Sequence, residues 1–168
     1  MQGSASYDAT RKYRYTLHRR WSAGPRRLCF CMLNPSTADA YKNDPTVRRC
    51  IGYAMDWGFD ALEVVNIFAL RSTDPAALAR DPDPVGPRNT NAIVRAALRS
   101  EFTVAAWGVH GALGGRGAFI LRKLCPRTDV RALGLTRERH PKHPLYLPRT
   151  AQPEPISPDL LVPPTVLV

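Results

Sequence analysis

The run Arg27-Leu28-Cys29-Phe30-Cys31-Met32-Leu33 carries the strongest fold signal in the chain, and Asn34-Pro35 follows it directly. Apolar residues fill both alternating sets of positions in this run, so a strand formed here would be buried on both faces. Strands of that kind belong to parallel sheets that are covered by helices. The run therefore predicts a central strand of an α/β domain, and the Asn-Pro pair marks its end.

Helix and strand signals alternate after this run. A helix is expected to begin at Asn43-Asp44-Pro45, because Asp44 can cap it and proline suits the first helical position. Apolar residues then recur at helical spacing until Gly58, which is expected to end the helix. Further buried strands are expected over 61–65, 102–107 and 130–133, and further helices over 88–100 and through 119–124.

This alternation of strands and helices predicts a parallel sheet with helices on both faces, connected in the right-handed sense. Residues 13–17 alternate bulky and polar side chains, so they are expected to add an antiparallel strand at an edge. We expect one domain over residues 1–150. The proline-rich remainder, 151–168, is expected to form an extended or disordered tail.

The charge of the chain favours anionic partners. Its 168 residues carry a formal net charge of +10, which suits nucleic acid, nucleotides or phosphorylated metabolites. Arginine greatly outnumbers lysine, however, and an arginine-rich genome would give a basic solvated surface of the same composition. Charge alone therefore leaves both interpretations about equally open.

Cysteine spacing and hydropathy narrow the class of protein further. The four cysteines match no zinc or iron–sulfur spacing, so they are expected to be small buried residues in the reduced state. No apolar run approaches the roughly 20 residues needed to span a bilayer, and residues 1–14 contain no secretory h-region. A cytoplasmic protein without a membrane partner is the expectation.

Polar side chains follow each of the four predicted buried strands. In open α/β sheets, ligands bind outside the carboxyl ends of the strands, so these side chains are expected to form one site. For any one loop, turn chemistry and helix capping explain the same residues. The residues expected in the site are Asn34, Pro35, Ser36, Asp39, Asn66, Phe68, Arg71, Trp107, Gly108, His110, His140, His143, Leu145 and Tyr146.

Particular chemistry is expected of a few of these residues. Asn34 can donate and accept a hydrogen bond at once, and His143, held before a proline, can act as a general acid or stabilise a developing anion. Asp39 and Asp44 are the only carboxylates near the first motif. Asp39 is expected to be catalytic together with Asn34 and His143, whereas for Asp44 a capping role is favoured.

Phosphate contacts are expected from Arg48 and Arg116, in addition to Arg71. Arg48 and Arg49 would point about 100° apart on a helix, so at most one of them would face the site. The glycine-rich stretch 114–117 could cradle a phosphate, although it matches neither the dinucleotide fingerprint nor the P-loop.

Five motifs together resemble an uncharacterised bacterial domain family, over roughly residues 13–148. They are Met-Leu-Asn-Pro-Ser-Thr-Ala-Asp (32–39), Asn-Asp-Pro-Thr-Val-Arg-Arg-Cys (43–50), Val-Val-Asn-Ile-Phe-Ala-Leu-Arg (64–71), Trp-Gly-Val-His-Gly (107–111) and His-Pro-Lys-His-Pro-Leu-Tyr-Leu (140–147). Membership of this family implies no established activity.

The layout is also distantly similar to the uracil-DNA glycosylase superfamily, especially its mismatch-specific branch. Met32-Leu33-Asn34-Pro35-Ser36 stands where that superfamily has Gly-x-Asn-Pro-Gly, and Asn66 stands where it has a base-reading asparagine. Trp107-Gly108 matches its Trp-Gly, and His143-Pro144-Leu145 occupies its His-Pro-Ser position. Both motif glycines and the serine are replaced here, and the catalytic aspartate of the classical branch has no match.

This resemblance implies a three-layer α/β sandwich whose four parallel strands lie in the order 2-1-3-4. It implies that Asn34 orients a water, that His143 stabilises a departing base anion and that Asn66 reads the base edge. Phe68 or Trp107 would supply an apolar wall, and Leu145 or Tyr146 a wedge. Neither a metal nor a cofactor is needed.

Three functions therefore stay open. The first is glycosylase-like hydrolysis of the N-glycosidic bond of a modified or mismatched base, with DNA or a nucleotide as partner. The second is a non-catalytic module that binds a nucleotide or nucleic acid. The third is an enzyme acting on an unrelated small molecule, because a fold does not fix a function. A monomer is the expected state.

Overall fold

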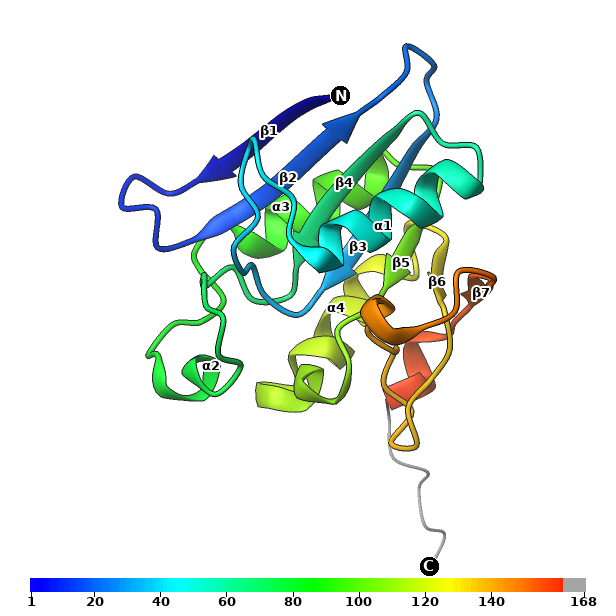
Figure 1. Ribbon diagram of the computed structural model, residues 1–168. Coiled ribbons are helices and arrows are strands. Elements are labelled where there is room, and N and C mark those ends of the chain that lie inside the picture. Colours follow the sequence, from blue (N-terminus) through cyan, green and yellow to red (C-terminus); the bar gives the residue numbers. More distant parts are fainter. Residues whose placement is uncertain (162–168) are drawn as a thin grey trace, which may run out of the picture.

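The computed structural model describes residues 1–161 and shows one mixed sheet with helices on both faces (Figure 1). The strands are β1 Gln2–Tyr7, β2 Arg14–Arg20, β3 Arg27–Met32, β4 Ala61–Asn66, β5 Thr103–Ala105, β6 Val130–Ala132 and β7 Glu154–Pro155. The helices are α1 Pro45–Asp56, α2 Ala77–Arg80, α3 Asn89–Leu98 and α4 Arg116–Leu124, and short 3₁₀ helices span η1 Val109–Gly115, η2 Pro144–Tyr146 and η3 Pro158–Leu161.

The sheet has seven strands in the order β1-β2-β4-β3-β5-β6-β7. The neighbours β4, β3, β5 and β6 pair in parallel, which is the order 2-1-3-4 when β3 counts as the first strand. The pairs β1–β2, β2–β4 and β6–β7 are antiparallel. The sheet is therefore mixed, and it is wider than the four parallel strands with one edge strand expected from the sequence.

The structure corrects the prediction that residues 13–17 form a strand at the edge of the sheet. The alternating residues belong to β2, which pairs antiparallel with β4 as expected but is covered on its outer side by β1. The six residues of β1 are mostly small and polar, so they carry no alternating apolar pattern. Strand β1 forms because its backbone groups pair with β2, with Ala5 opposite Leu17.

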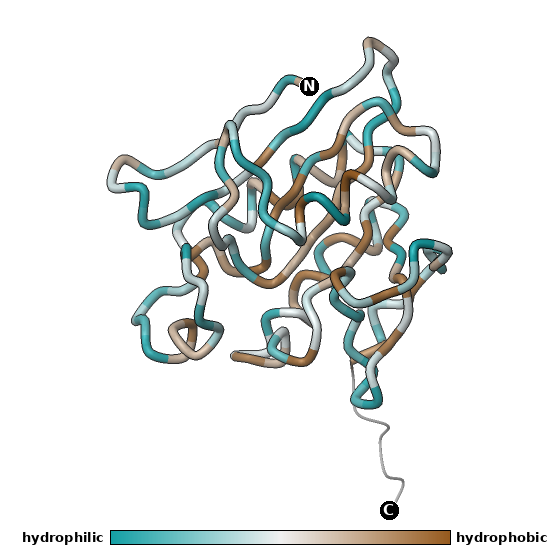
Figure 2. The backbone as a smooth tube through the Cα atoms, in the orientation of Figure 1, coloured by the Kyte–Doolittle hydropathy of each residue, from teal (hydrophilic) through white to brown (hydrophobic). Residues whose placement is uncertain are grey.

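The central strand β3 is buried on both faces, as its continuous apolar run predicts. Cys29 and Cys31 pack in one apolar cluster with α3 and α4, whereas Leu28 and Phe30 pack in a second cluster with α1. The helices thus cover opposite faces of the sheet (Figure 1), and the most apolar segments gather around its centre (Figure 2). Burial raises the pKa of the Cys31 thiol to about 12, which keeps it protonated.

Helix α1 begins where its capping sequence predicts. The Oδ1 of Asp44 accepts a hydrogen bond from the backbone N–H of Val47 at 2.8 Å, and Pro45 takes the first helical position. Gly58 follows the helix with a φ of +75°, a left-handed conformation that favours glycine. The helices expected near residues 88–100 and 119–124 correspond to α3 and α4, whereas the four-residue α2 has no periodic signal.

The start of the proline-rich segment lies against the domain. Strand β7 pairs with β6, and the backbone N–H of Ile156 donates to the carbonyl of Val130 at 3.0 Å. Leu160, in η3, is buried in the same apolar cluster as α4. The rest of the tail expected from the sequence, 162–168, lies outside the described residues. Within residues 1–161, no helix has the length and apolarity that crossing a membrane requires.

Candidate functional site

A pocket of about 550 Å³ opens at the carboxyl ends of β3 and β4, between the loops that follow β5 and β6. Eight of the residues expected in the site line it: Asn34, Ser36, Asn66, Gly108, His110, His143, Leu145 and Tyr146. Further polar lining comes from Arg14, Asp44, Thr46, Ser72 and Thr73. The pocket therefore joins side chains that lie more than 100 residues apart in the sequence.

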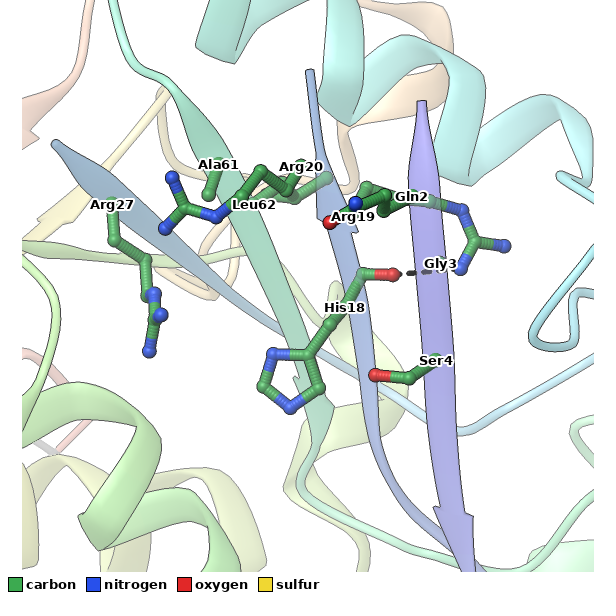
Figure 3. Close-up of a pocket in the computed structure, with 9 residues that line it drawn as sticks. All are labelled: Gln2, Gly3, Ser4, His18, Arg19, Arg20, Arg27, Ala61 and Leu62. Atoms are coloured by element: carbon green, nitrogen blue, oxygen red, sulfur yellow. Dashed lines mark hydrogen bonds between the residues drawn. The ribbon is translucent and has the colours of Figure 1, made fainter. Parts of the chain in front are cut away.

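A second pocket, of about 520 Å³, lies at the opposite end of the sheet, where β3 and β4 begin (Figure 3). Its lining includes the side chains of His18, Arg20 and Arg27. The Nε2 of His18 lies 3.4 Å from Oε1 of the buried Glu63. This imidazole therefore already has a partner within the protein. The pocket at the carboxyl ends brings together more groups able to take part in chemistry, and we take it as the candidate site.

Asn34 presents an acceptor to the pocket. Its Nδ2 donates to the carbonyl oxygens of Ser72 at 2.9 Å and Pro35 at 3.1 Å, and these bonds tie the loop after β3 to the loop after β4. Among the described residues, its Oδ1 has no hydrogen-bond donor. The amide is therefore oriented by the fold, and the oxygen is the atom available to a ligand or a water.

Asn66 presents a donor. Its Oδ1 accepts a hydrogen bond from Nη2 of Arg14 at 3.3 Å. A guanidinium can only donate, so this bond fixes which end of the amide faces Arg14. The Nδ2 of Asn66 has no acceptor within residues 1–161, and it is the atom that a ligand can use.

Arg14 is a site residue that the sequence interpretation missed. It lies in β2, between Tyr13 and Tyr15, where the alternation assigned polar side chains to a wet face. In the structure Arg14 is only 2% exposed and lines the pocket. Antiparallel pairing of β2 with β4 brings it there, and no local signal in the sequence reports that pairing.

His143 lines the pocket, and one of its two ring nitrogens is engaged by the protein backbone. Its Nδ1 accepts the backbone N–H of Leu145 at 3.3 Å, so the proton of the neutral ring resides on Nε2. Burial lowers the pKa of His143, and the negative charge of Asp44 opposes this shift without overcoming it. At neutral pH the ring is therefore uncharged, and its Nε2–H, which has no acceptor among residues 1–161, can donate to a ligand.

We expect His143 to titrate below its ordinary pKa of 6.5. The folded state binds this proton less readily than the unfolded state, so the stability contributed by the neutral ring is full above about pH 6.5. That contribution is lost as the pH falls through the lower folded-state pKa. Proton NMR of the ring C–H signals, assigned with a His143→Gln variant, measures the midpoint. A midpoint at or above 6.5 would contradict a buried neutral imidazole.

Asp44 both caps α1 and lines the pocket. The capping role favoured from the sequence is confirmed by the bond from the Val47 N–H to Oδ1. The second carboxylate oxygen has no hydrogen-bond partner among residues 1–161. Asp44 is the one carboxylate among the described residues that line this pocket.

The loop that carries His143 is tied to two other parts of the site. Arg49 donates to the carbonyl oxygen of Leu147, and the Tyr53 hydroxyl donates to that of Pro148 at 2.8 Å. The backbone N–H of Gly108 donates to the carbonyl of Pro141 at 2.8 Å. Helix α1 and the loop after β5 thus hold the imidazole in place.

Two aromatic residues expected as an apolar wall lie in the core. Trp107 is 1% exposed and Phe68 is 2% exposed, and neither lines the pocket. A Cβ added to Gly117 would lie 2.8 Å from the Nε1 of Trp107, so glycine there lets α4 approach the indole. This packing gives the glycine-rich stretch a structural role, and its residues do not line the pocket.

The remaining expected site residues make other contacts. Asp39 accepts the N–H groups of Tyr41 and Lys42, each at 2.8 Å, and so closes a turn. Pro35 is buried and does not line the pocket, and the backbone N–H of His140 donates to Oγ1 of Thr136 at 3.1 Å. The arginines donate to protein oxygens: Arg48 to Asn43, Arg71 to Arg11, and Arg116 to Ile67 and Thr90.

Fold and site together define an α/β protein with a pocket at the carboxyl ends of its central parallel strands, lined by both apolar and polar side chains. The chain belongs to the family described as "Protein of unknown function (DUF1643)", whose model matches residues 14–145. That stretch contains every pocket-lining residue except Tyr146. No curated protein and no solved structure matches the chain significantly. The expected membership of an uncharacterised family is confirmed.

Proposed function

We propose that the protein binds a nucleobase-containing substrate in this pocket and hydrolyses its N-glycosidic bond. The observation that carries the proposal is the gathering of Asn34, Asn66, Asp44 and a neutral His143 around one pocket. Its volume of about 550 Å³ suits a ligand of nucleoside size. The distant likeness to uracil-DNA glycosylases, with the +10 net charge, supports a nucleic acid or nucleotide as substrate.

Each group has a role that its available atoms permit. A water attacks the anomeric carbon, the bond from that carbon to the base breaks, and the base leaves with the electron pair. The Nε2–H of His143 donates to the departing anion, and the Nδ2 of Asn66 donates to an acceptor on the base edge. The free oxygens of Asn34 and Asp44 accept hydrogen bonds from the water, and Asp44 takes its proton.

The decisive experiment is a base-release assay. Single- and double-stranded oligonucleotides carrying uracil, hypoxanthine or bulky modified bases, together with free nucleotides, are incubated with the protein. Alkaline cleavage then reports abasic sites, and chromatography reports free base. We expect His143→Ala to reduce release by about 100-fold or more, because general acid–base groups contribute on that scale.

The matched control is His18→Gln, which changes a histidine in the second pocket and keeps a donor toward Glu63. This variant is expected to release base at the wild-type rate. Equal losses in both variants, or no loss in His143→Ala, would contradict the assignment of His143.

A second candidate is a binding module without turnover. It is favoured by two contacts: the N–H groups of Asn34 are engaged by carbonyl oxygens, and one oxygen of Asp44 is engaged as a helix cap. This candidate predicts that ligand raises the melting temperature without any base release. Absence of both release and binding would overturn both candidates and leave an enzyme of another class.

A further inference from the structure

Arg14 is a buried cation whose protein contacts leave it incompletely satisfied. Its Nη1 donates to the carbonyl of Ala38 at 2.8 Å and its Nη2 to Asn66 at 3.3 Å. Both acceptors are neutral. A guanidinium has five N–H donors, and the Nε of Arg14 is buried without an acceptor within residues 1–161. A donor with no partner therefore lies in a side chain that lines the pocket.

The charge on Arg14 is also unpaired. Within the described part of the chain, no carboxylate lies within 4.0 Å of the guanidinium. Burial lowers the pKa of Arg14 to about 10, against the opposing influence of Tyr7 and Asp44, so it remains charged at neutral pH. The charges of Arg71 and Arg19 lie close enough to lower this pKa further. Among the described residues, the cation of Arg14 is therefore in direct contact with no carboxylate.

A buried, unpaired cation is costly unless an anion reaches it. Arg14 lines the pocket and its side chain is only 2% exposed, so an anion from solvent reaches it through the pocket. An internal phosphodiester carries chain on both sides and cannot enter end-on. A terminal phosphate or a carboxylate can do so, and its oxygens match the planar donors of a guanidinium.

We propose that the pocket binds its ligand through a terminal anionic group, a phosphate monoester or a carboxylate, that is seated on Arg14. The inference rests on the proposed function for the identity of the pocket, and it narrows the substrate to a free nucleotide or a carboxylated base. Asp44, on the same pocket, repels the anion and so limits its affinity. The donor of Asn66 and the imidazole of His143 remain for the rest of the ligand.

Calorimetric titration of the full chain with matched ligand pairs tests the proposal. The phosphate arm compares nucleoside 5′-monophosphates with their nucleosides, and the carboxylate arm compares uracil-6-carboxylate with uracil. In one arm the charged ligand is expected to bind about 10- to 100-fold more tightly, the usual range for a hydrogen-bonded charge. The arm that shows this preference identifies the anion. Equal affinity within both pairs would overturn the proposal.

Two variants connect the preference to Arg14. Arg14→Met is expected to abolish the preference, and Arg14→Lys to keep part of it. Asp44→Asn keeps a capping side chain and is expected to bind the charged ligand more tightly than the wild type. A preference that persists in folded Arg14→Met would overturn the proposal. If Arg14→Met does not fold, the proposal is decided by the affinities of the matched ligand pairs for the wild-type protein and for Asp44→Asn.

The result is separable from that of the base-release assay, because calorimetry reads binding and needs no turnover. Loss of the charge preference alongside intact base release would overturn this inference alone. A charge preference without base release would overturn the hydrolytic function alone.

Discussion

Replacing Arg99 with methionine is expected to lower the free energy of unfolding by about 3 kcal/mol, because the change leaves the buried carboxylate of Glu63 without its main partner. Glu63 lies in β4 and is fully buried, and Arg99 binds both of its carboxylate oxygens, with Nε at 2.7 Å from Oε2. The remaining positive partner, Arg27, lies at 3.8 Å. Burial lowers the pKa of His18, so this third neighbour is uncharged at neutral pH. Methionine would therefore leave a buried carboxylate with weak compensation.

Urea denaturation measures the change, and the chain offers a matched control. Arg95 lies one turn earlier on α3, is exposed and forms no ion pair among the described residues, so Arg95→Met is expected to change stability by less than about 0.5 kcal/mol. The double variant Glu63→Leu/Arg99→Met is expected to recover most of the loss, because an apolar pair removes the buried charge. An Arg99→Met protein as stable as the wild type would contradict this account.

Replacing Trp107 with alanine is expected to lower the free energy of unfolding by about 3–5 kcal/mol. The indole is among the largest fully buried side chains and packs in the cluster formed by α3, α4 and the sheet. Gly111 and Gly117 lie directly against the indole. Because glycine has no side chain, neither residue could fill the space that the alanine substitution would leave. A cavity would remain where α4 meets the sheet.

Val109→Ala is the control for this prediction, because Val109 lies two residues away, is 44% exposed and lines the pocket. It is expected to change stability by less than about 0.5 kcal/mol. Denaturation and ligand titration together distinguish a core role for Trp107 from a role in contacting the ligand. A stable Trp107→Ala protein that no longer binds ligand would show that the indole contacts the ligand and is not a core residue.

The amino-acid sequence alone specifies the central strand, the first long helix and the gathering of polar groups at the strand ends. These features rest on local physics. A continuous apolar run has no wet face, Asp44 caps the helix through a residue three positions away, and parallel strands bring their carboxyl ends to one edge. The local pattern therefore predicts that Asn34, Asn66 and His143 lie at the strand ends, and all three line the pocket. The same pattern also predicts Phe68 and Trp107 there, and both lie in the core.

Features that depend on pairing across the sheet follow from the tertiary structure, and no local sequence pattern predicts them. The position of Arg14 at the pocket results from the register of β2 on β4, in which Leu17 lies opposite Val64. Strand β1 has no apolar pattern and is stabilised by backbone bonds to a strand that must form with it.

The tertiary structure also decides which side chains after a strand end lie in the core and which line the pocket. Gly108 has a φ of +71° and lines the pocket, whereas the indole of Trp107, the residue before it, packs in the core against Gly111 and Gly117. Side-chain direction at such a turn depends on backbone dihedrals and on the helix packed alongside. Neither is encoded in the local alternation of apolar and polar residues.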